Sequence, residues 1–542
     1  MRFDLLTEPW FPVVRSDGSA TELGLAEVLL QAHDLRWIEA EAPVVTAALH
    51  RLLLALAHRA YGPPTTRRWE SLWSARELPR DELEKYQQDF GDRFDLFGPR
   101  PFLQCPGLAE KAMGSAKQLL MPTSSGSNAT LFHHTTSRDH VEVPAAAAAR
   151  WMVALQAYDT GGLKTPFRKD KSSKCAVCNQ FGAVVVEGAT LKETLLLNLQ
   201  VYAPGRGKPP GTTEHDRPQW ELDEPPRPDP EMSRIPRGWT DVLTWPSRRI
   251  LLRAVDRGGE PYVDRAVITP GDRFTEKLHE AEHQAAFRQP MKQNKKKEWK
   301  PDGEPRPIRL EELRGAWRYC RELLLAAPPE NPRHRPTVLD HVAANAPEDA
   351  VYTLRIYGQA LGAKAAVVHT WLQESVPAPV PLLRADESDD RVGPLLGLAA
   401  DLADNIGWAL ERMEKKYEAA FALEKEHAER RSALAQWYWP ELSAPFGVVL
   451  RDVGVALATE HPSPAAAQRA LFDPFEQWAQ CVRRISEQAV RTWVWNLPRE
   501  SGRQLLALAE PESWFHAHSE RLYREYRTDR DATWDSGQEN DE

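Results

Sequence analysis

The stretch 395–420, LLGLAADLADNIGWALERMEKKYEAA, decides the fold of the C-terminal part of this chain. Its apolar side chains recur every three or four residues, and charged side chains occupy the opposite face, which is the pattern of a long amphipathic helix. Three further stretches show the same periodicity: 433–458, 464–495 and 501–526. Four such helices with short connections predict a four-helix bundle.

The residues before this bundle follow a different pattern. Short apolar or alternating runs predict strands, and they are separated by helices and by a long proline-rich connection over 203–238. The expected strands are Val184–Val186, Thr194–Leu199, Arg248–Arg253 and Tyr352–Gly358, and the turn Ser16–Gly18 is typical of a hairpin. A proline-rich segment, Pro377–Pro381, is the expected linker to the bundle. We therefore predict an α+β chain, with a mixed α/β domain over 1–380, the bundle over 381–528 and a disordered acidic tail over 529–542.

Composition limits the class of protein. With 542 residues the chain is long enough for more than one core, and its net charge of −9 argues against coating nucleic acid by bulk positive charge. Five cysteines, an odd number, indicate a reducing compartment. The sequence has neither an apolar run of membrane-spanning length nor a signal peptide, so we expect a cytoplasmic protein with no membrane partner.

The segment Tyr158–Lys164, YDTGGLK, joins the end of a predicted helix to the basic run Arg168–Lys174. Two adjacent glycines let the backbone turn freely and let a ligand come close, and the following cations suit a polyanion. An ordinary helix end followed by a solvated loop explains the same residues, and composition alone favours that simpler interpretation.

Two other stretches carry possible chemistry. The polar loop 121–134 offers many hydrogen-bond donors that could grip a phosphate or an extruded base, although a surface loop need not bind anything. His133, His134, Asp139 and His140 come nearest to a metal cluster, and a metal-dependent nuclease built on them is one alternative function. Cys175 and Cys178 have the spacing of half a zinc site, but no second pair follows, so we predict no metal and no cofactor. The sequence contains no phosphate-binding loop, HExxH motif or nucleophile elbow, and we predict a protein without catalytic activity.

Three segments in register resemble one family. They are Asp4–Trp10 (DLLTEPW), Asp92–Gln104 and the run SNATLFHH over 127–134. Together they are similar to CasA, the large-subunit family of the type I-E CRISPR surveillance complex Cascade. The resemblance implies a non-catalytic subunit that recognises the protospacer-adjacent motif in double-stranded DNA, helps to start R-loop formation and recruits the helicase-nuclease. It also implies contact with the crRNA 5′ end and with the other Cascade subunits; a protein-only scaffold is the remaining alternative.

The resemblance also implies site residues. The motif-reading and DNA-binding positions are Gly161, Gly162, Thr160, Lys295, Lys296, Lys297, Gln359 and Gly362. Among them the lysines lie in the basic window Arg288–Lys300, which without the resemblance is equally well a solvated charge run. The positions of the crRNA-end loop are Ser125, Gly126, Asn128, Thr130, Phe132 and His133. In relatives, a wedge with a glutamine at its tip lies near the position of Gly362 and splits the first base pair. The glutamine of this chain, Gln359, lies three residues upstream of Gly362.

Overall fold

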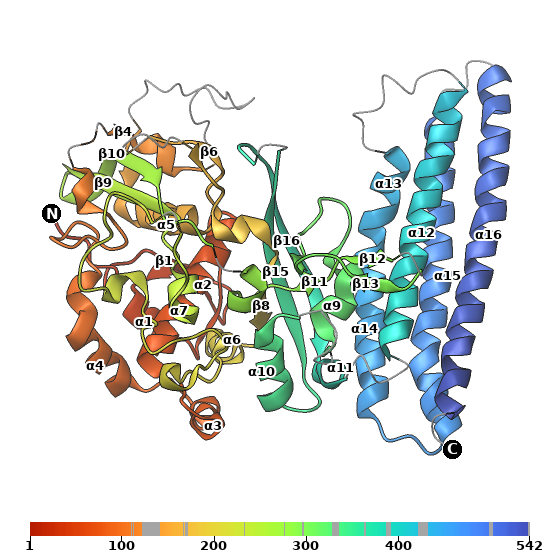
Figure 1. Ribbon diagram of the computed structural model, residues 1–542, viewed down its shortest axis with the longest axis horizontal. Coiled ribbons are helices and arrows are strands. Elements are labelled where there is room, and N and C mark those ends of the chain that lie inside the picture. Colours follow the sequence, from red (N-terminus) through yellow and green to blue (C-terminus); the bar gives the residue numbers. More distant parts are fainter. Residues whose placement is uncertain are drawn as a thin grey trace.

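The computed structural model of the chain describes residues 1–109, 111, 113–121, 141–165, 167, 172–231, 233–275, 277–294, 297–327, 335–362, 365–385, 392–420, 432–497 and 502–539. A mixed α/β body forms one end of the molecule and a helical bundle the other, with a long strand pair between them (Figure 1). The predicted α+β fold with a C-terminal four-helix bundle is therefore confirmed.

The N-terminal sheet has the strand order β2-β1-β3, formed by Ala20–Leu23, Phe11–Arg15 and Leu35–Ile38. Gly18 in the β1–β2 turn has a φ of +85°, which a glycine adopts without strain, so the predicted hairpin forms at Ser16–Gly18. The body also contains helices α1 Leu25–Leu30, α2 Pro43–Tyr61, α3 Thr66–Ser74, α4 Arg80–Phe90, α5 Ala145–Tyr158, α7 Trp239–Leu243, α8 Leu278–Ala281, α9 Cys320–Leu324 and α10 Thr337–Asn345. Helices α2 and α5 pack together and are buried over most of their length, which accounts for their apolar sequences.

Two larger sheets complete the body. In one, β9 Arg248–Arg257 and β10 Glu260–Pro270 form a hairpin that is extended by β4 Gly114–Ser115 and β5 Val143–Pro144. In the other, the order is β16-β15-β8, from Val368–Pro379, Val351–Leu361 and Ala183–Glu187. Short pairs are β6 Gly162–Leu163 with β7 Ser172–Ser173, β11 Phe287–Arg288 with β14 Arg306–Pro307, and β12 Met291–Gln293 with β13 Trp299–Pro301. Single turns of 3₁₀ helix are η1 Gly91–Arg93, η2 Pro106–Leu108, η3 Ala116–Leu119, η4 Val177–Gln180, η5 Pro204–Arg206, η6 Gln219–Glu221 and η7 Ala316–Tyr319.

The predicted strand Thr194–Leu199 is wrong, because these residues belong mainly to helix α6, Leu191–Asn198. The Thr190 hydroxyl caps the helix by accepting a hydrogen bond from the Glu193 amide. At the other end, the Asn198 side chain binds the backbone N–H and C=O of Val186 at 3.1 and 2.8 Å, so a side chain replaces the expected strand ladder. The strands predicted at Val184–Val186, Arg248–Arg253 and Tyr352–Gly358 are confirmed.

The bundle consists of α12 Val392–Ala419, the broken helix α13 Ala433–Tyr438, η8 Trp439–Leu442 and α14 Ser443–Ala458, then α15 Pro464–Asn496 and α16 Gly502–Glu539. The break lies where Pro440 enters the chain, because proline cannot donate the helical hydrogen bond. Ser463 caps α15 through its hydroxyl, directly before Pro464. Within the part of the chain that the structure describes, no helix is long and apolar enough to cross a membrane.

Two boundary predictions are corrected by the structure. The expected linker Pro377–Pro381 is the end of β16 followed by α11, Val380–Arg384, and Ala378 and Val380 are completely buried. One core joins Leu354 of the ladder to Trp478 of the bundle, so both sides of the expected boundary are packed together. In the expected disordered tail 529–542, helix α16 continues to Glu539.

Candidate nucleic-acid interface

The glycine loop, residues 159–163, leaves the end of helix α5 and becomes the short strand β6, which pairs with β7. Gly162 has a φ of +115°, a backbone conformation that is strained for any residue with a side chain. Leu163 next to it is 80% exposed. The predicted basic run begins beyond β6, and of it the structure describes 172–174, while 168–171 lie outside the described residues. The loop is therefore a thin, partly exposed backbone ribbon.

The tip of the β15–β16 hairpin lies against this glycine loop. The Gly161 amide donates to the Ala365 carbonyl at 2.8 Å, and within the tip the Gly362 amide donates to the Val367 carbonyl at 2.9 Å. Gln359 does not lie at the tip; it lies in β15, and its side-chain nitrogen donates to the Tyr158 carbonyl at 2.7 Å, at the start of the loop. The structure thus brings together Thr160, Gly161, Gly162, Gln359 and Gly362, although 200 residues of sequence separate the two segments.

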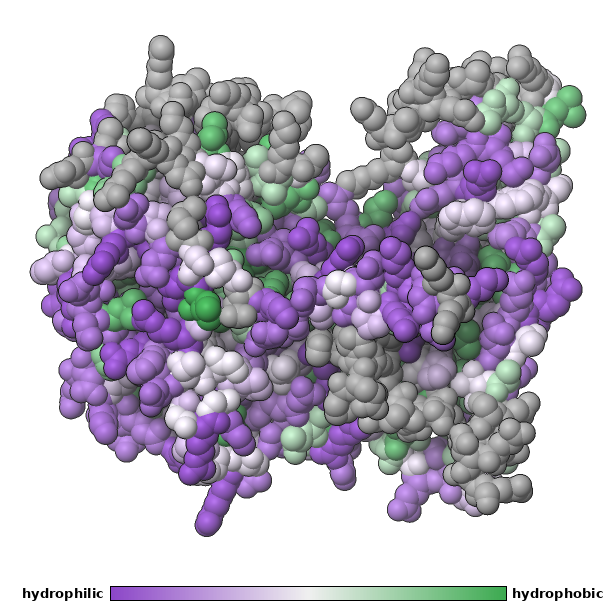
Figure 2. Space-filling view, viewed as in Figure 1, coloured by the Kyte–Doolittle hydropathy of each residue, from purple (hydrophilic) through white to green (hydrophobic). Residues whose placement is uncertain are grey.

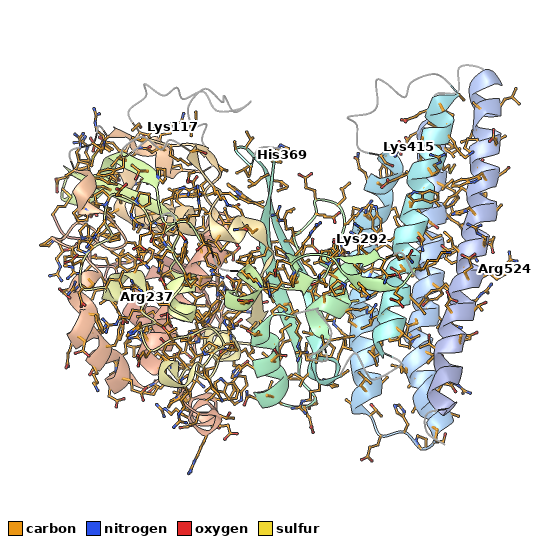
Figure 3. The ribbon with its side chains drawn as sticks, viewed as in Figure 1. Lys117, Arg237, Lys292, His369, Lys415 and Arg524 are labelled. Carbon is orange, nitrogen blue, oxygen red and sulfur yellow. The ribbon has the colours of Figure 1, made fainter. Side chains whose placement is uncertain are left out.

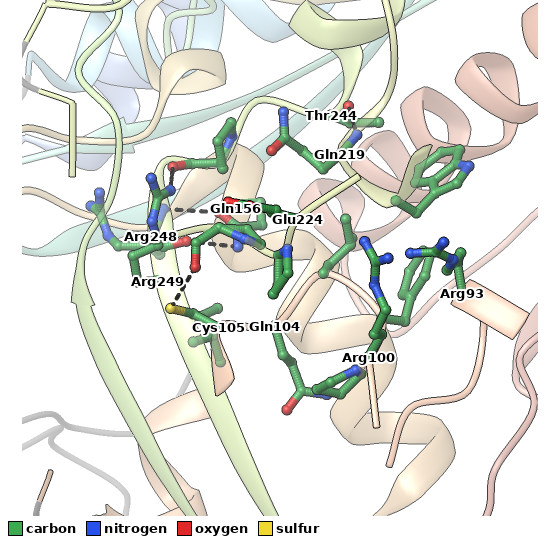
Figure 4. Close-up of a pocket in the computed structure, with 18 residues that line it drawn as sticks. Arg93, Arg100, Gln104, Cys105, Gln156, Gln219, Glu224, Thr244, Arg248 and Arg249 are labelled. Carbon is green, nitrogen blue, oxygen red and sulfur yellow. Dashed lines mark hydrogen bonds between the residues drawn. The ribbon is translucent and has the colours of Figure 1, made fainter. Parts of the chain in front are cut away.

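A buried arginine that was not predicted as a site residue supports the glycine loop from its buried side. Arg248 is 2% exposed, pairs with the Asp159 carboxylate, and donates to the carbonyls of Thr160 at 2.9 Å and Lys174 at 3.0 Å. Its backbone is held in turn by the Gln156 side chain, with hydrogen bonds of 2.9 and 3.0 Å (Figure 4). A single guanidinium therefore joins the two chain segments that lead into β6 and out of β7.

Asp159 carries the negative charge that pairs with Arg248. Besides Arg248 it pairs with the Lys164 ammonium at 2.8 Å. Burial alone would raise the pKa of Asp159, but the two cations outweigh it and hold the pKa below its ordinary value. The carboxylate is therefore ionised at neutral pH. No spacing rule links Asp159 to Arg248, because 89 residues of sequence separate them.

Two further cations lie around a small pocket behind β7. Lys174 and Arg273 line it together with the buried Ser247, whose hydroxyl has no hydrogen-bond partner in the described structure. Neither cationic side chain forms an ion pair with another described residue. Positive charge without a protein partner, beside an exposed backbone loop, suits a nucleic-acid phosphate. Only the fold brings Arg273 to this place.

Of the three predicted lysines, the structure describes only Lys297, which lies away from the glycine loop. Lys297 is in the turn between β12 and β13, where its amide donates to the Asn294 carbonyl at 2.9 Å, and Lys295 and Lys296 lie outside the described residues. Along the long axis of the molecule, this hairpin lies on the opposite side of the β15–β16 ladder from β6 (Figure 1), and Lys292 at its base points between the ladder and the bundle (Figure 3). In this structure the lysine hairpin and the glycine loop are thus separate surfaces.

The crRNA-end residues Ser125, Gly126, Asn128, Thr130, Phe132 and His133 fall within 122–140, outside the described residues, as do His134, Asp139 and His140 of the nuclease alternative. Elsewhere, in the described part of the chain, no group of three His, Cys, Asp or Glu side chains could hold a metal ion. Cys178 is buried, which raises the pKa of its thiol to about 12, while Cys175 is half-buried.

Comparison with known proteins gives consistent matches along most of the chain. A family model for the CRISPR-associated protein Cse1 matches residues 4–486. The CRISPR-associated protein CasA/Cse1 of Thermus thermophilus is 31% identical over 472 residues, covering 82% of this chain and 86% of that protein. The crystal structure of Cse1 from Thermobifida fusca has a TM-score of 0.77 at 28% identity and covers 96% of this chain and 98% of that one. A chain of a CRISPR RNA-guided surveillance complex shares the fold, with a TM-score of 0.71 at 22% identity and coverage of 95% and 99%.

Proposed function

The chain belongs to the CRISPR-associated Cse1 family, and on that basis we propose that it is the non-catalytic large subunit of an RNA-guided surveillance complex. In this role it recognises the protospacer-adjacent motif in double-stranded DNA, helps to start R-loop formation and recruits the helicase-nuclease. Its partners are the crRNA 5′ end, through the predicted loop Ser124–His134, and the other subunits of the complex. A chain with this fold is part of an RNA-guided surveillance complex, which supports the assignment.

The hydrogen bond between Gly161 and Ala365 is the observation that carries the proposal. It joins a thin glycine ribbon to the tip of a long hairpin, so that the two segments are in direct contact. The minor groove is narrow and offers a degenerate pattern of donors and acceptors, which a backbone ribbon can read loosely. A hairpin tip at a fixed distance from that ribbon would then meet the first base pair beyond the motif and open it.

Arg273 and Lys174 are the cations that we assign to the DNA backbone beside the glycine loop. They line the pocket behind β7, whereas the β12–β13 hairpin, which carries Lys297, lies toward the bundle (Figure 1). The face in Figure 2 is largely hydrophilic, with a notch between the α/β body and the bundle. The β12–β13 hairpin lies between the β15–β16 ladder and the bundle (Figure 1), where it is suited to contact nucleic acid. A weakly read motif is sufficient, because guide pairing supplies the sequence discrimination.

Replacing Gly162 by Ala in the assembled complex tests the motif-reading loop. At its φ of +115° an alanine costs about 1–3 kcal/mol, so binding that needs this backbone should weaken by roughly 5- to 150-fold. Gly18→Ala is the matched control, because Gly18 also has a positive φ, of +85°, with open space around it, in a turn of the N-terminal sheet.

The measurement is the affinity of each complex for a motif-bearing duplex and for a duplex with a scrambled motif. Gly162→Ala should reduce the preference for the motif while crRNA and the other subunits still co-elute, and Gly18→Ala should leave both affinities unchanged. An unaltered preference in Gly162→Ala would remove the glycine loop from motif recognition. Cleavage of labelled DNA or RNA by the isolated chain with Mg²⁺ or Mn²⁺ would overturn the non-catalytic assignment.

A further inference from the structure

A cavity of about 320 Å³ lies between the first half of helix α2 and the β8–β15–β16 sheet. The segment 37–43 before α2 forms one wall, and side chains from α2, α6 and the sheet form the others. Pockets of about 300–1,000 Å³ between packed elements are the usual places for small ligands. The residues that line this cavity are distinct from those around the glycine loop, so it is a second, independent site.

Two deeply buried polar side chains face this cavity without a partner. His50 is 7% exposed and Tyr357 is 4% exposed, and their ring centroids lie 6.4 Å apart. Among the described residues, neither the His50 ring nitrogens nor the Tyr357 hydroxyl forms a hydrogen bond. Their polar atoms are not enclosed by protein and open onto the cavity, so a ligand bound there can form hydrogen bonds with both.

The charges around the cavity leave one carboxylate without a cation. Glu187 pairs with the Arg355 guanidinium at 2.8 Å, and Glu41 pairs with Arg150 at 2.6 Å. Glu39 accepts the Trp37 indole N–H at 3.1 Å and makes no ion-pair contact with a described residue, although its charge acts on Arg355 across the cavity. The unbalanced charge at the site is therefore negative.

Burial, reinforced by Arg355, lowers the pKa of His50 to about 4. At neutral pH its imidazole is therefore uncharged and has a nitrogen that can accept a hydrogen bond. The Tyr357 hydroxyl oxygen is a second acceptor and the Glu39 carboxylate a third. Three acceptors, one net negative charge and aromatic side chains line the same cavity.

We propose that this cavity binds a guanidinium group. A guanidinium is a planar cation with N–H donors on three sides, so it can meet Glu39, His50 and Tyr357 at once and stack on an aromatic face. A compact ammonium ion has three donors on one centre and fits spread acceptors less well. A phosphate would instead approach the three carboxylates that line the walls, which electrostatic repulsion disfavours.

Titration of methylguanidinium chloride into the full-length chain, followed by NMR or calorimetry, tests the proposal. Binding should be saturable and at least about fivefold tighter than binding of methylammonium chloride at the same ionic strength. Glu39→Gln should weaken it at least about tenfold, because it removes the unpaired charge and keeps the shape. Tyr357→Phe should also weaken it, and it should fold normally because the lost hydroxyl bonds no described residue.

Glu77→Gln is the matched control, since Glu77 is an exposed carboxylate in a surface turn away from the cavity, and its affinity should equal that of the wild type. Non-saturable binding, or wild-type affinity in Glu39→Gln, would overturn the proposal. Free L-arginine and the blocked peptide acetyl-Ala-Arg-Ala-amide then distinguish the source of the group. Tighter binding of the peptide identifies an arginine side chain of a partner protein, tighter binding of the amino acid identifies a metabolite, and binding of neither contradicts the proposal.

Discussion

Replacing Arg248 by Met should loosen the glycine loop without changing a residue of the loop itself. Removing one partner of a buried ion pair costs about 3–5 kcal/mol, because the other charge remains buried. Asp159 would keep its 2.8 Å contact with Lys164, so we expect a cost near the lower end, about 3 kcal/mol. The carbonyls of Thr160 and Lys174 would also lose their donor.

Amide hydrogen exchange at Gly161 measures this effect locally, because that amide is bonded to the Ala365 carbonyl. A cost of about 3 kcal/mol corresponds to exchange that is roughly 150-fold faster. Arg253→Met is the matched control: Arg253 lies on the same strand β9, but its side chain is 50% exposed in its pair with Asp264, and such surface pairs contribute about 0–1 kcal/mol. Gly161 exchange within about threefold of the wild type in Arg248→Met would refute the supporting role of Arg248.

The same ion pair predicts a pH dependence. The pKa of Asp159 in the folded chain lies below its ordinary value of 3.8, so the stabilisation is complete above that value and is lost as the pH falls through the folded pKa. Protection of Gly161, corrected for the intrinsic exchange rate, should therefore stay constant from about pH 8 to about pH 5. Loss of protection within that interval would indicate that another group titrates in the loop.

The remaining predictions concern charge, buried histidine and packing. Lys174→Ala and Arg273→Ala should each reduce the slope of log affinity against log salt by about 0.9, equally for duplexes with and without the motif, and an unchanged slope would exclude a phosphate contact. Burial depresses the pKa of His58 from 6.5 to about 3, so the free energy of unfolding should fall as the pH drops below 6.5. Denaturant unfolding of His58→Gln should show a loss of unfolding free energy between pH 7.5 and pH 5 that is smaller than in the wild type by about 2 kcal/mol. Gly407→Ala would place a Cβ atom 2.4 Å from the Trp439 ring and should lower the unfolding free energy by about 1–3 kcal/mol, whereas wild-type stability would show that the ring can move aside.

Much of the fold was predictable because it depends on local periodicity. Helices α12 and α15 begin and end close to the predicted limits, since an apolar stripe and, at α15, the N-terminal Ser463-Pro464 cap are properties of neighbouring residues. The strand predicted at Thr194–Leu199 failed for the opposite reason. A short apolar run fits a strand and a buried helix equally well, and here the Thr190 cap and the contact of Asn198 with β8 decide for the helix.

The site residues also divide into those that the sequence indicated and those that only the structure revealed. From the sequence alone, with the family resemblance that its motifs carry, the glycine pair, Gln359 and Gly362 could be named as members of one DNA-reading surface. Only the tertiary structure joined Gly161 to Ala365, connected Thr160 and Lys174 through Arg248, and placed Arg273 in the pocket behind β7. The physical reason is that glycine turns and helical stripes are local properties of the chain. A buried ion pair or a backbone contact between segments depends on how distant residues are folded together, and no local pattern encodes that distance.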